Sequence, residues 1–537
     1  MLSYRKLAMR VLGRPLHTEG IDSPRPASQR AAAFILTAAM LTTLAAPAFA
    51  DIWHIENGDI TISAGESGNN VTQNNNTTYG GTNTIITNQN KDTASSHTVT
   101  IEAKDKDDKV EVTLKDVNID TSSRNKAAVS VTGEGDTNIK LDGDNALKSD
   151  IYRSGIYGSG SGSLTISGGE NDSLTAQGGS GANGISSSGS LTISGGTVTA
   201  NGDDGGRGIS SNGGVTISGG STVTANGGSG TISGGDGICS SGGVTISGGS
   251  TVTANGGNGG SLVGGDGIRS GGGLTVSDGT VTAKGGNGDS KDGYGGDGIR
   301  SGGVVTISGN TVNAAGGYGG KVGGYGICSF DRVAISGGMV EAAGGNGSTG
   351  GGSGIYSSVI DLSGSLELTA KAGSPNGKAL SQKGSELVLD TIKDKLGPGA
   401  KVTATDADGK VIDQVSTPRP VEPEESSSSS DGGSAAPSAP ASPLPGLTVT
   451  DKDGQRISYT STQSGNTLTV CVGRLTASFR ISLAALRQLR AEGIETIAFQ
   501  TVLCSTTLSV DELLAMGGEN AEAVLTHRFT DSSLTVG

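Results

Sequence analysis

The sequence predicts an all-β fold: a parallel β-helix of three-strand coils, with a small C-terminal α+β domain after a Pro/Ser-rich linker. Three observations predict it. Nearly the same sequence motif, built on apolar-Thr-apolar-Ser-Gly-Gly, recurs every 24 to 31 residues. Apolar and polar residues alternate with period two inside each copy of the motif, and glycine-rich breaks separate the copies. A fixed period of roughly 20–50 residues indicates stacked repeats. The second apolar residue of the motif recurs at Ile166, Ile193, Ile217, Ile246, Val276, Ile307, Ile335 and Leu362.

Glycine makes up 95 of the 537 residues, whereas aromatic residues make up only 3%. A collagen helix is excluded because the glycines follow no strict triplet and the chain has only 13 prolines. Disorder is excluded for the repeat region because β-branched residues return there at alternating positions. We expect the glycines to occupy turns that need a positive φ.

Residues 1–50 have the pattern of a signal peptide. Basic residues come first, an apolar run follows over 31–46, and Ala48-Phe49-Ala50 is a small-residue cleavage site. A membrane anchor is the alternative, although the run is short for a span. No later stretch is long and apolar enough to cross a bilayer. We therefore expect a secreted protein, extracellular or associated with a cell surface.

Removal of residues 1–50 lowers the basic residues from 38 to 32 and the acidic residues from 52 to 50, so the mature chain carries a net charge of −18. This balance disfavours nucleic acid as a partner, because phosphate binding needs clustered cations. It favours solubility and permits cation binding. We expect a monomer with no membrane span in the mature chain.

Residues 51–155 are expected to form an N-terminal cap and irregular first coils. Their strand-like runs lie at 60–62, 98–101, 110–114, 117–119 and 129–131. Polar turns separate these runs. The segment therefore predicts the opening of the same stack, with a less regular end.

Residues 156–416 are expected to form the regular coils and the C-terminal cap coils. In Leu191-Thr192-Ile193-Ser194, period two sends Leu191 and Ile193 to one face and the polar pair to the other. The Thr-Val-Thr-Ala run at 197–200 and a short Gly-Ile element supply two more strands. Stacking then places Ile on Ile in a continuous narrow core. A right-handed coil is expected, as for other parallel crossovers.

Residues 417–445 hold a serine run and seven of the prolines, which predicts a disordered linker. Residues 446–537 change character. Strand patterns at 447–450, 468–472 and 497–503 alternate with helical apolar periods at 482–491 and 510–516. We expect a small, separate α+β domain.

Catalytic residues are sparse. The three histidines after residue 50 are His54, His97 and His527, and none lies in the regular coils. Their scatter supports no Ser-His-Asp or Cys-His arrangement. We expect a protein that is not an enzyme. A polysaccharide lyase or hydrolase is the alternative, because some parallel β-helices are such enzymes.

Three aspartates recur at one register in consecutive coils, in the motif Gly-Gly-Asp-Gly-Ile: Asp236, Asp266 and Asp297. Carboxylates about 5 Å apart repel one another by roughly 1–3 kcal/mol, and a bound Ca²⁺ would remove that cost. Calcium is therefore the candidate cofactor. Alternatively, the aspartates serve turn geometry and pair with Arg269 and Arg300, which follow three residues later.

Residues that follow each Gly-Ile form an outward column that includes Arg269, Arg300 and Tyr356, and three loop tyrosines are expected near it. Tyrosine offers an apolar face and a hydroxyl to a sugar ring, and arginine suits sugar carboxylates. Scattered surface residues are the alternative interpretation. The candidate ligand-binding residues are Tyr294, Tyr318, Tyr325, Tyr356, Arg269 and Arg300.

The four cysteines form no zinc-site spacing. Cys239 and Cys328 occupy equivalent positions three coils apart. Strands stack about 4.8 Å apart, so these thiols should lie roughly 14 Å apart, too far for a disulfide. Cys471 and Cys504 both lie in strand-like runs, and a bond between them is possible.

The runs VEVTLKDVNI at 110–119, AAVSV at 127–131, NIKLDGDN at 138–145 and LTISGG at 164–169 carry a family resemblance. Over about residues 51–400 the chain resembles the secreted carbohydrate-binding-domain-containing parallel β-helix proteins of anaerobic Firmicutes. The resemblance implies a lyase-like shape that binds plant-type polysaccharide, acidic polymers included, with bound calcium. It transfers no individual binding residue, because the matching positions are core and turn residues.

These observations favour a secreted, non-catalytic protein that binds an extracellular polysaccharide. A structural or adhesive surface stalk (an adhesin) is the second hypothesis, and a polysaccharide lyase or hydrolase is the third.

Overall fold

The computed structural model describes residues 51–309 and 311–418, and then 447–450, 456–457, 459–464, 466–472, 477–501, 505–516, 521–527 and 532–536. The chain divides into two compact units between Pro423 and Glu424. The predicted signal peptide, nearly all of the predicted linker, and Cys504 lie outside the described residues.

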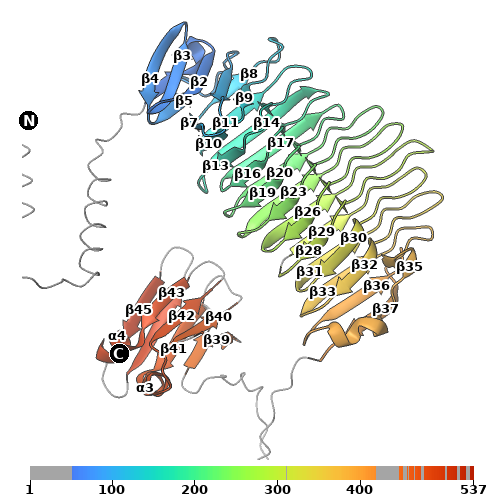
Figure 1. Cartoon of the computed structure of the whole chain (residues 1–537). Helices are drawn as coiled ribbons and strands as arrows, with labels where there is room; N and C mark the ends of the chain where they lie inside the picture. Colours follow the sequence, from blue (N-terminus) through green and yellow to red (C-terminus); the bar gives the residue numbers. More distant parts are fainter. Residues whose placement is uncertain are drawn as a thin grey trace, which may run out of the picture. The chain divides into compact units, whose positions relative to one another are not determined.

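The first unit is a β-solenoid of about 13 turns in which parallel strands of successive coils stack on one another (Figure 1). The predicted parallel β-helix is therefore confirmed. Each regular coil gives one strand to each of three ladders, here called ladders 1, 2 and 3.

Ladder 1 contains the Gly-Ile strands and the strands in register with them. They are β6 (Val99–Ala103), β9 (Val129–Gly133), β12 (Ile156–Gly158), β15 (Ile185–Ser187), β18 (Ile209–Ser211), β21 (Ile238–Ser240), β24 (Ile268–Ser270), β27 (Ile299–Ser301), the first parts of β30 (Ile327–Ile335) and β32 (Ile355–Leu362), and β34 (Leu380–Gln382).

Ladder 2 contains the apolar-Thr-apolar strands and the strands in register with them. They are β1 (Asp51–His54), β5 (Thr84–Thr87), β7 (Lys109–Lys115), β10 (Asp136–Asp142), β13 (Leu164–Ser167), β16 (Leu191–Ser194), β19 (Val215–Ser218), β22 (Val244–Ile246), β25 (Leu274–Val276), β28 (Val305–Ile307) and the second parts of β30 and β32.

Ladder 3 is a separate 12-stranded sheet. Its strands are β8 (Asn118–Asp120), β11 (Asp144–Lys148), β14 (Ser173–Ser180), β17 (Thr197–Asp203), β20 (Thr222–Asn226), β23 (Ser250–Asn255), β26 (Gly279–Lys284), β29 (Thr311–Ala315), β31 (Gly338–Ala343), β33 (Leu366–Lys371), β36 (Lys401–Thr405) and β37 (Val411–Ser416).

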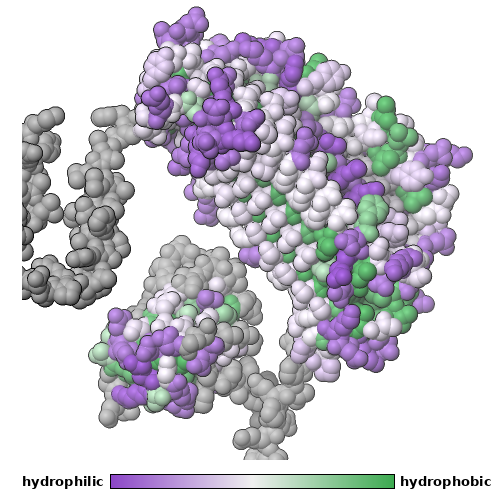
Figure 2. Space-filling view, viewed as in Figure 1, coloured by the Kyte–Doolittle hydropathy of each residue, from purple (hydrophilic) through white to green (hydrophobic). Residues whose placement is uncertain are grey.

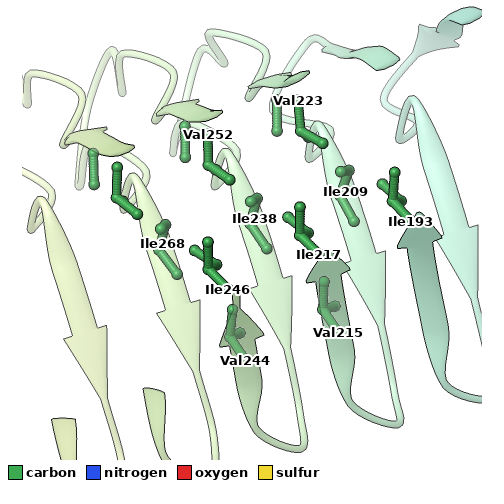
Figure 3. Close-up of a cluster of buried hydrophobic side chains, with 14 of the residues drawn as sticks. Ile193, Ile209, Val215, Ile217, Val223, Ile238, Val244, Ile246, Val252 and Ile268 are labelled. Atoms are coloured by element: carbon green, nitrogen blue, oxygen red, sulfur yellow. The ribbon is translucent and has the colours of Figure 1, made fainter. Parts of the chain in front are cut away.

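The core is a set of parallel columns of like side chains (Figure 3). Ile209 pairs in register with Ile238, and Ile238 with Ile268. All three side chains are fully buried. Because each isoleucine rests on another of the same shape, the interior packs without wide gaps, and each such burial contributes about 1.5–3 kcal/mol.

Both ends of the stack are covered by antiparallel strands. At the N-terminal end β2 (Ile60–Gly65), β3 (Gly68–Gln73) and β4 (Asn76–Gly81) form an antiparallel meander. At the other end β37 runs antiparallel to β36, and β35 (Ser385–Glu386) and the 3₁₀ helix η2 (Leu389–Lys395) lie in the same closing segment. Such changes of direction protect the open edges of a parallel stack.

The glycine-rich breaks between ladder 3 and ladder 1 are paired arms rather than loose loops. Rising arms leave ladder 3 at 227–229, 256–258, 285–287, 316–318 and 344–346, and falling arms enter ladder 1 at 234–236, 264–266, 295–297, 323–325 and 351–353. A zigzag of backbone hydrogen bonds joins the two sets. Gly265 N–H donates to Gly257 O, and Gly286 N–H donates to Gly265 O, each at 2.8 Å. In Figure 1 these segments run side by side from coil to coil.

Each arm has the sequence Gly-Gly-X, and the Cα–H bonds of the two glycines point at different neighbouring backbones. In the rising arm a Cβ on Gly256 would lie 2.0 Å from the oxygen of Gly265 on the falling arm. A Cβ on Gly257 would lie 2.1 Å from the oxygen of Gly228, one coil earlier. The third residue, Asn258, does carry a side chain, and its Oδ1 accepts the N–H of Asn287 on the rising arm of the next coil at 2.9 Å. Glycine is required here by close approach of backbones, as at the axis of collagen.

The expectation that the glycines serve positive φ is wrong for these arms. No arm glycine has φ in the left-handed region, whereas the pair after ladder 2 does, for example Gly219 at 67° and Gly220 at 70°. Turn glycines and arm glycines thus meet two different physical demands.

The second unit contains two four-stranded sheets and two helices among its described residues. One sheet comprises β38 (Leu447–Thr450), β41 (Ala477–Ser482), β44 (Glu522–His527) and β45 (Ser532–Val536); the other comprises β39 (Thr460–Ser464), β40 (Thr467–Cys471), β42 (Thr496–Gln500) and β43 (Ser505–Ser509). The helices are α3 (Leu483–Ala491), capped by the Ser482 hydroxyl, and α4 (Val510–Met516). Its own core is centred on Phe479 and Phe499. In the described part of the chain no helix is long and apolar enough to span a membrane.

Candidate functional site

The residues that follow each Gly-Ile, and the residues in register with them in the first and last coils, form one unbroken register along ladder 1, here called the outer column. Its members are Thr100, Ser130, Tyr157, Ser186, Ser210, Cys239, Arg269, Arg300, Cys328, Tyr356 and Ser381. At about 4.8 Å per rung the column is roughly 50 Å long. Cys239 and Cys328 lie three rungs apart and are both free thiols, in agreement with the predicted separation.

Arg269 and Arg300 are adjacent in the outer column. The Arg300 guanidinium lies 5.3 Å from the ring centroid of Phe330 and 3.4 Å from an Asp297 carboxylate oxygen. The Arg269 guanidinium lies 4.0 Å from Asp266. The predicted arginine–aspartate pairing is therefore confirmed. Both arginine side chains keep a third or more of their surface exposed, so they still offer donors to a ligand.

The three aspartates occupy the third position of three falling arms and form a column beside the outer column. Asp266 N–H donates to Asp236 Oδ1 at 2.9 Å, and Asp297 N–H donates to Asp266 Oδ1 at 2.8 Å. The next falling arm continues the pattern, since Tyr325 N–H donates to Asp297 Oδ1 at 2.7 Å. Each aspartate is only 4–6% exposed. Asp236 also faces Arg207, from the previous coil, at 3.3 Å.

Burial, together with the charges of Asp297 and Asp236, raises the pKa of Asp266 to about 8. Burial also raises the pKa of Asp297, to about 6, while the Tyr325 N–H and Arg300 oppose the shift. A low-polarity site disfavours the charged form of a carboxyl group. Asp266 and Asp297 therefore hold protons more readily than exposed carboxyl groups do.

Calcium fits this donor set poorly. In each aspartate Oδ1 accepts a backbone N–H and Oδ2 faces an arginine, so a cation would have to displace positive charge. Among the residues described, no group of three or more His, Cys, Asp or Glu side chains is arranged to hold a metal ion. Calcium binding at Asp236, Asp266 and Asp297 stays a prediction.

The four candidate tyrosines divide into two sets. The rings of Tyr325 and Tyr356 stack, with centroids 4.9 Å apart, and place an aromatic surface at the outer column. Tyr318 takes the third position of a rising arm, whereas Tyr325 takes that of a falling arm, and among the described residues the tyrosine stack joins only Tyr325 and Tyr356. Tyr294 lies near the arm tips, where the Lys321 ammonium lies 5.6 Å from its ring centroid. The outer column therefore gathers Arg269, Arg300, Tyr325 and Tyr356, but not Tyr294 and Tyr318.

Sequence reasoning missed Phe330 and Arg207, which contact candidate residues. Phe330 lies within β30, between the part that pairs in ladder 1 and the part that pairs in ladder 2, and its contact with Arg300 crosses one coil. Arg207 occupies the register of the aspartates one coil earlier, and this equivalence could have been read from its Gly-Ile neighbours.

No family model matches this chain, and neither does any curated protein or solved structure.

Proposed function

We propose that the chain is a secreted, non-catalytic protein that binds an extracellular polysaccharide along the outer column. One observation carries the proposal: the column keeps a single register over eleven rungs, from Thr100 to Ser381, beside stacked tyrosines and two partly exposed arginines. An extended polymer that lies along ladder 1 would meet one residue of the outer column about every 4.8 Å. The bare fold is compatible with many functions, so the argument depends on these side chains.

The side chains at the outer column suit a sugar chain. The Tyr325–Tyr356 stack offers an apolar face of the kind that packs on pyranose rings. Arg300 is held by Phe330 and Asp297, which limits its conformations before a ligand arrives. A pre-ordered arginine loses less entropy on binding. Acidic polymers are therefore included among the proposed ligands.

The direct test is a glycan array with the full chain, run with and without EDTA. We expect retention on one or more plant-type polysaccharides, pectin-like or cellulosic. A signal that falls with EDTA supports calcium assistance, and an unchanged signal removes calcium from the proposal. Unsaturated products or new reducing ends after incubation with a polyuronide overturn the non-catalytic assignment and favour a lyase or hydrolase.

A structural or adhesive stalk is the second candidate, and the paired glycine arms favour it. Backbone hydrogen bonds join the arms across and along the coils, which makes the solenoid a stiff rod. This alternative predicts adherence to host or neighbouring cells without retention on plant glycans.

Three finer features belong to the same proposal. We take the solenoid to be right-handed, the protein to be monomeric, and residues 446–537 to be a separate α+β domain that follows a disordered linker. Limited proteolysis that releases a stable fragment beginning near residue 446 supports the last of these.

A further inference from the structure

An open cleft of about 350 Å³ lies over the first coils, away from the arginines and tyrosines of the proposed site. This volume falls in the range of small-ligand sites, about 300–1,000 Å³. The side chains used in the argument are Thr100, Asn125, Lys126, Ser130, Arg153 and Tyr157.

One side of the cleft is the beginning of the outer column. Thr100 pairs in register with Ser130, and Ser130 pairs with Tyr157. Two hydroxyl groups therefore lead to a tyrosine that is 42% exposed. Such a row offers hydrogen bonds to sugar hydroxyls and a ring face for packing.

The other side carries two stacked cations. Lys126 and Arg153 each lie three residues before the paired residues Val129 and Ile156, so they occupy equivalent positions in adjacent coils. Like charges at this spacing repel each other. Lys126 is compensated because its ammonium lies 2.9 Å from Asp59. Although burial opposes it, hydrogen bonds from Lys126, the Thr98 backbone and Arg124 lower the pKa of Asp59 to about 2, so that carboxylate stays charged.

Arg153 has no such compensation. Its Nε donates to Asn125 Oδ1 at 3.3 Å, and within the described ranges no carboxylate pairs with its guanidinium. No carboxylate side chain lines the cleft either. On a chain of formal net charge −14, an exposed guanidinium without a carboxylate partner, beside an exposed tyrosine, is suited to receive an anion.

We propose that this cleft binds a carboxylated sugar unit, a uronic acid residue of the polysaccharide. The Arg153 guanidinium receives the carboxylate, Tyr157 packs on the ring, and Thr100 and Ser130 bond ring hydroxyls. A planar carboxylate matches the fork of a guanidinium in two parallel hydrogen bonds. The inference rests on the proposed polysaccharide binding and assigns an acidic subsite at the N-terminal end of the outer column.

The test uses the full chain and calorimetric titration with trigalacturonate and, in parallel, a neutral cello-oligosaccharide. Arg153→Gln should weaken trigalacturonate binding about 10-fold or more, since a charge-assisted contact is lost. Tyr157→Ser should weaken it severalfold. Arg487→Gln, which changes an exposed arginine of α3, is the matched control and should bind like wild type. Circular dichroism and melting temperature verify that each variant is folded.

The outcomes separate the two claims. Wild-type retention on a neutral polymer without trigalacturonate binding, or undiminished trigalacturonate binding by both variants, overturns the acidic subsite and leaves the proposed function standing. Absence of any polysaccharide binding by wild type overturns both. Dextran sulfate is a competitor that carries sulfate groups in place of carboxylates. If it displaces trigalacturonate from wild type as well as unlabelled trigalacturonate does, and if Arg153→Gln weakens its binding equally, the assignment of a carboxylate is contradicted.

Discussion

The backbone N–H of Asp297 donates to Oδ1 of Asp266, one coil earlier, at 2.8 Å. Asp266 in turn donates to Asp236 in the same way. Each buried carboxyl group thus serves the coil that follows it as a hydrogen-bond acceptor, much as an asparagine would. The column joins the falling arms through side chains, in addition to the backbone zigzag between arms.

This arrangement predicts that stability depends on pH through Asp266, whose pKa is raised by burial and by its neighbours to about 8. The folded state then binds the proton more tightly than the unfolded state, so the free energy of unfolding falls as pH rises from about 4 to about 8. Asp266→Asn keeps an Oδ1 acceptor and removes the charge. We expect this variant to gain about 1–2 kcal/mol over wild type at pH 8, and less near pH 4.

Denaturant titration of the full chain, followed by circular dichroism at both pH values, measures this difference. Asp278→Asn is the control, because Asp278 is exposed and should show little effect at either pH. Equal destabilisation of Asp266→Asn at pH 4 and pH 8 would contradict the raised pKa.

The sequence predicts the solenoid well because its period places like residues at one register. Ile193, Ile217 and Ile246 occupy the same position of the repeated motif, and they stack in ladder 2. The outer column follows from the same counting, as do the Arg269–Asp266 and Arg300–Asp297 pairs. These are predictable because a fixed repeat converts sequence distance into spatial position.

Other contacts cannot be predicted from the sequence repeat, because they depend on how the segments outside the strands fold. The sequence contains the Gly-Gly-X triplets, but glycine-rich segments are typical of turns, so the sequence alone does not predict the interlocked arms. The separation of Tyr318 from Tyr325 follows from those arms. The cleft at Arg153 depends on an irregular turn in the first coils, where the repeat supplies no template.

The paired arms predict a sharp difference between two glycine substitutions. A Cβ on Gly286 would lie 1.9 Å from the Gly257 oxygen, which forces the arms apart, whereas a Cβ on Gly350 would only touch Val322 at 3.8 Å. We expect Gly286→Ala to lower the free energy of unfolding by about 2–4 kcal/mol and Gly350→Ala to change it by less than about 0.5 kcal/mol. Thermal unfolding of the full-length variants checks this. Similar values for both would show that the arms yield easily.

A buried serine ladder lies beside the outer column and makes a third stability prediction. The Ser301 hydroxyl donates to the Gly272 oxygen at 2.9 Å, and Ser270 and Ser329 make equivalent bonds in adjacent coils. Ser301→Ala should cost about 1 kcal/mol through the lost hydrogen bond, and Ser301→Val should cost more because the site is fully buried. Denaturant titration gives both values, with the exposed Ser188→Ala as control. If Ser301→Val left the free energy of unfolding unchanged, the site around Ser301 would not be tightly packed.

Retention of the full chain on immobilised polysaccharides, measured for wild type and for Arg269→Gln/Arg300→Gln/Tyr356→Ala, tests binding along the outer column most directly. Tyr79→Ala, at an exposed tyrosine of β4, is the control for loss of an aromatic residue elsewhere. We expect wild type and the control to be retained on at least one polymer, and the triple variant to elute about 10-fold more readily or to pass through. Retention of the triple variant equal to that of wild type, or no retention of wild type on any polymer, contradicts the account.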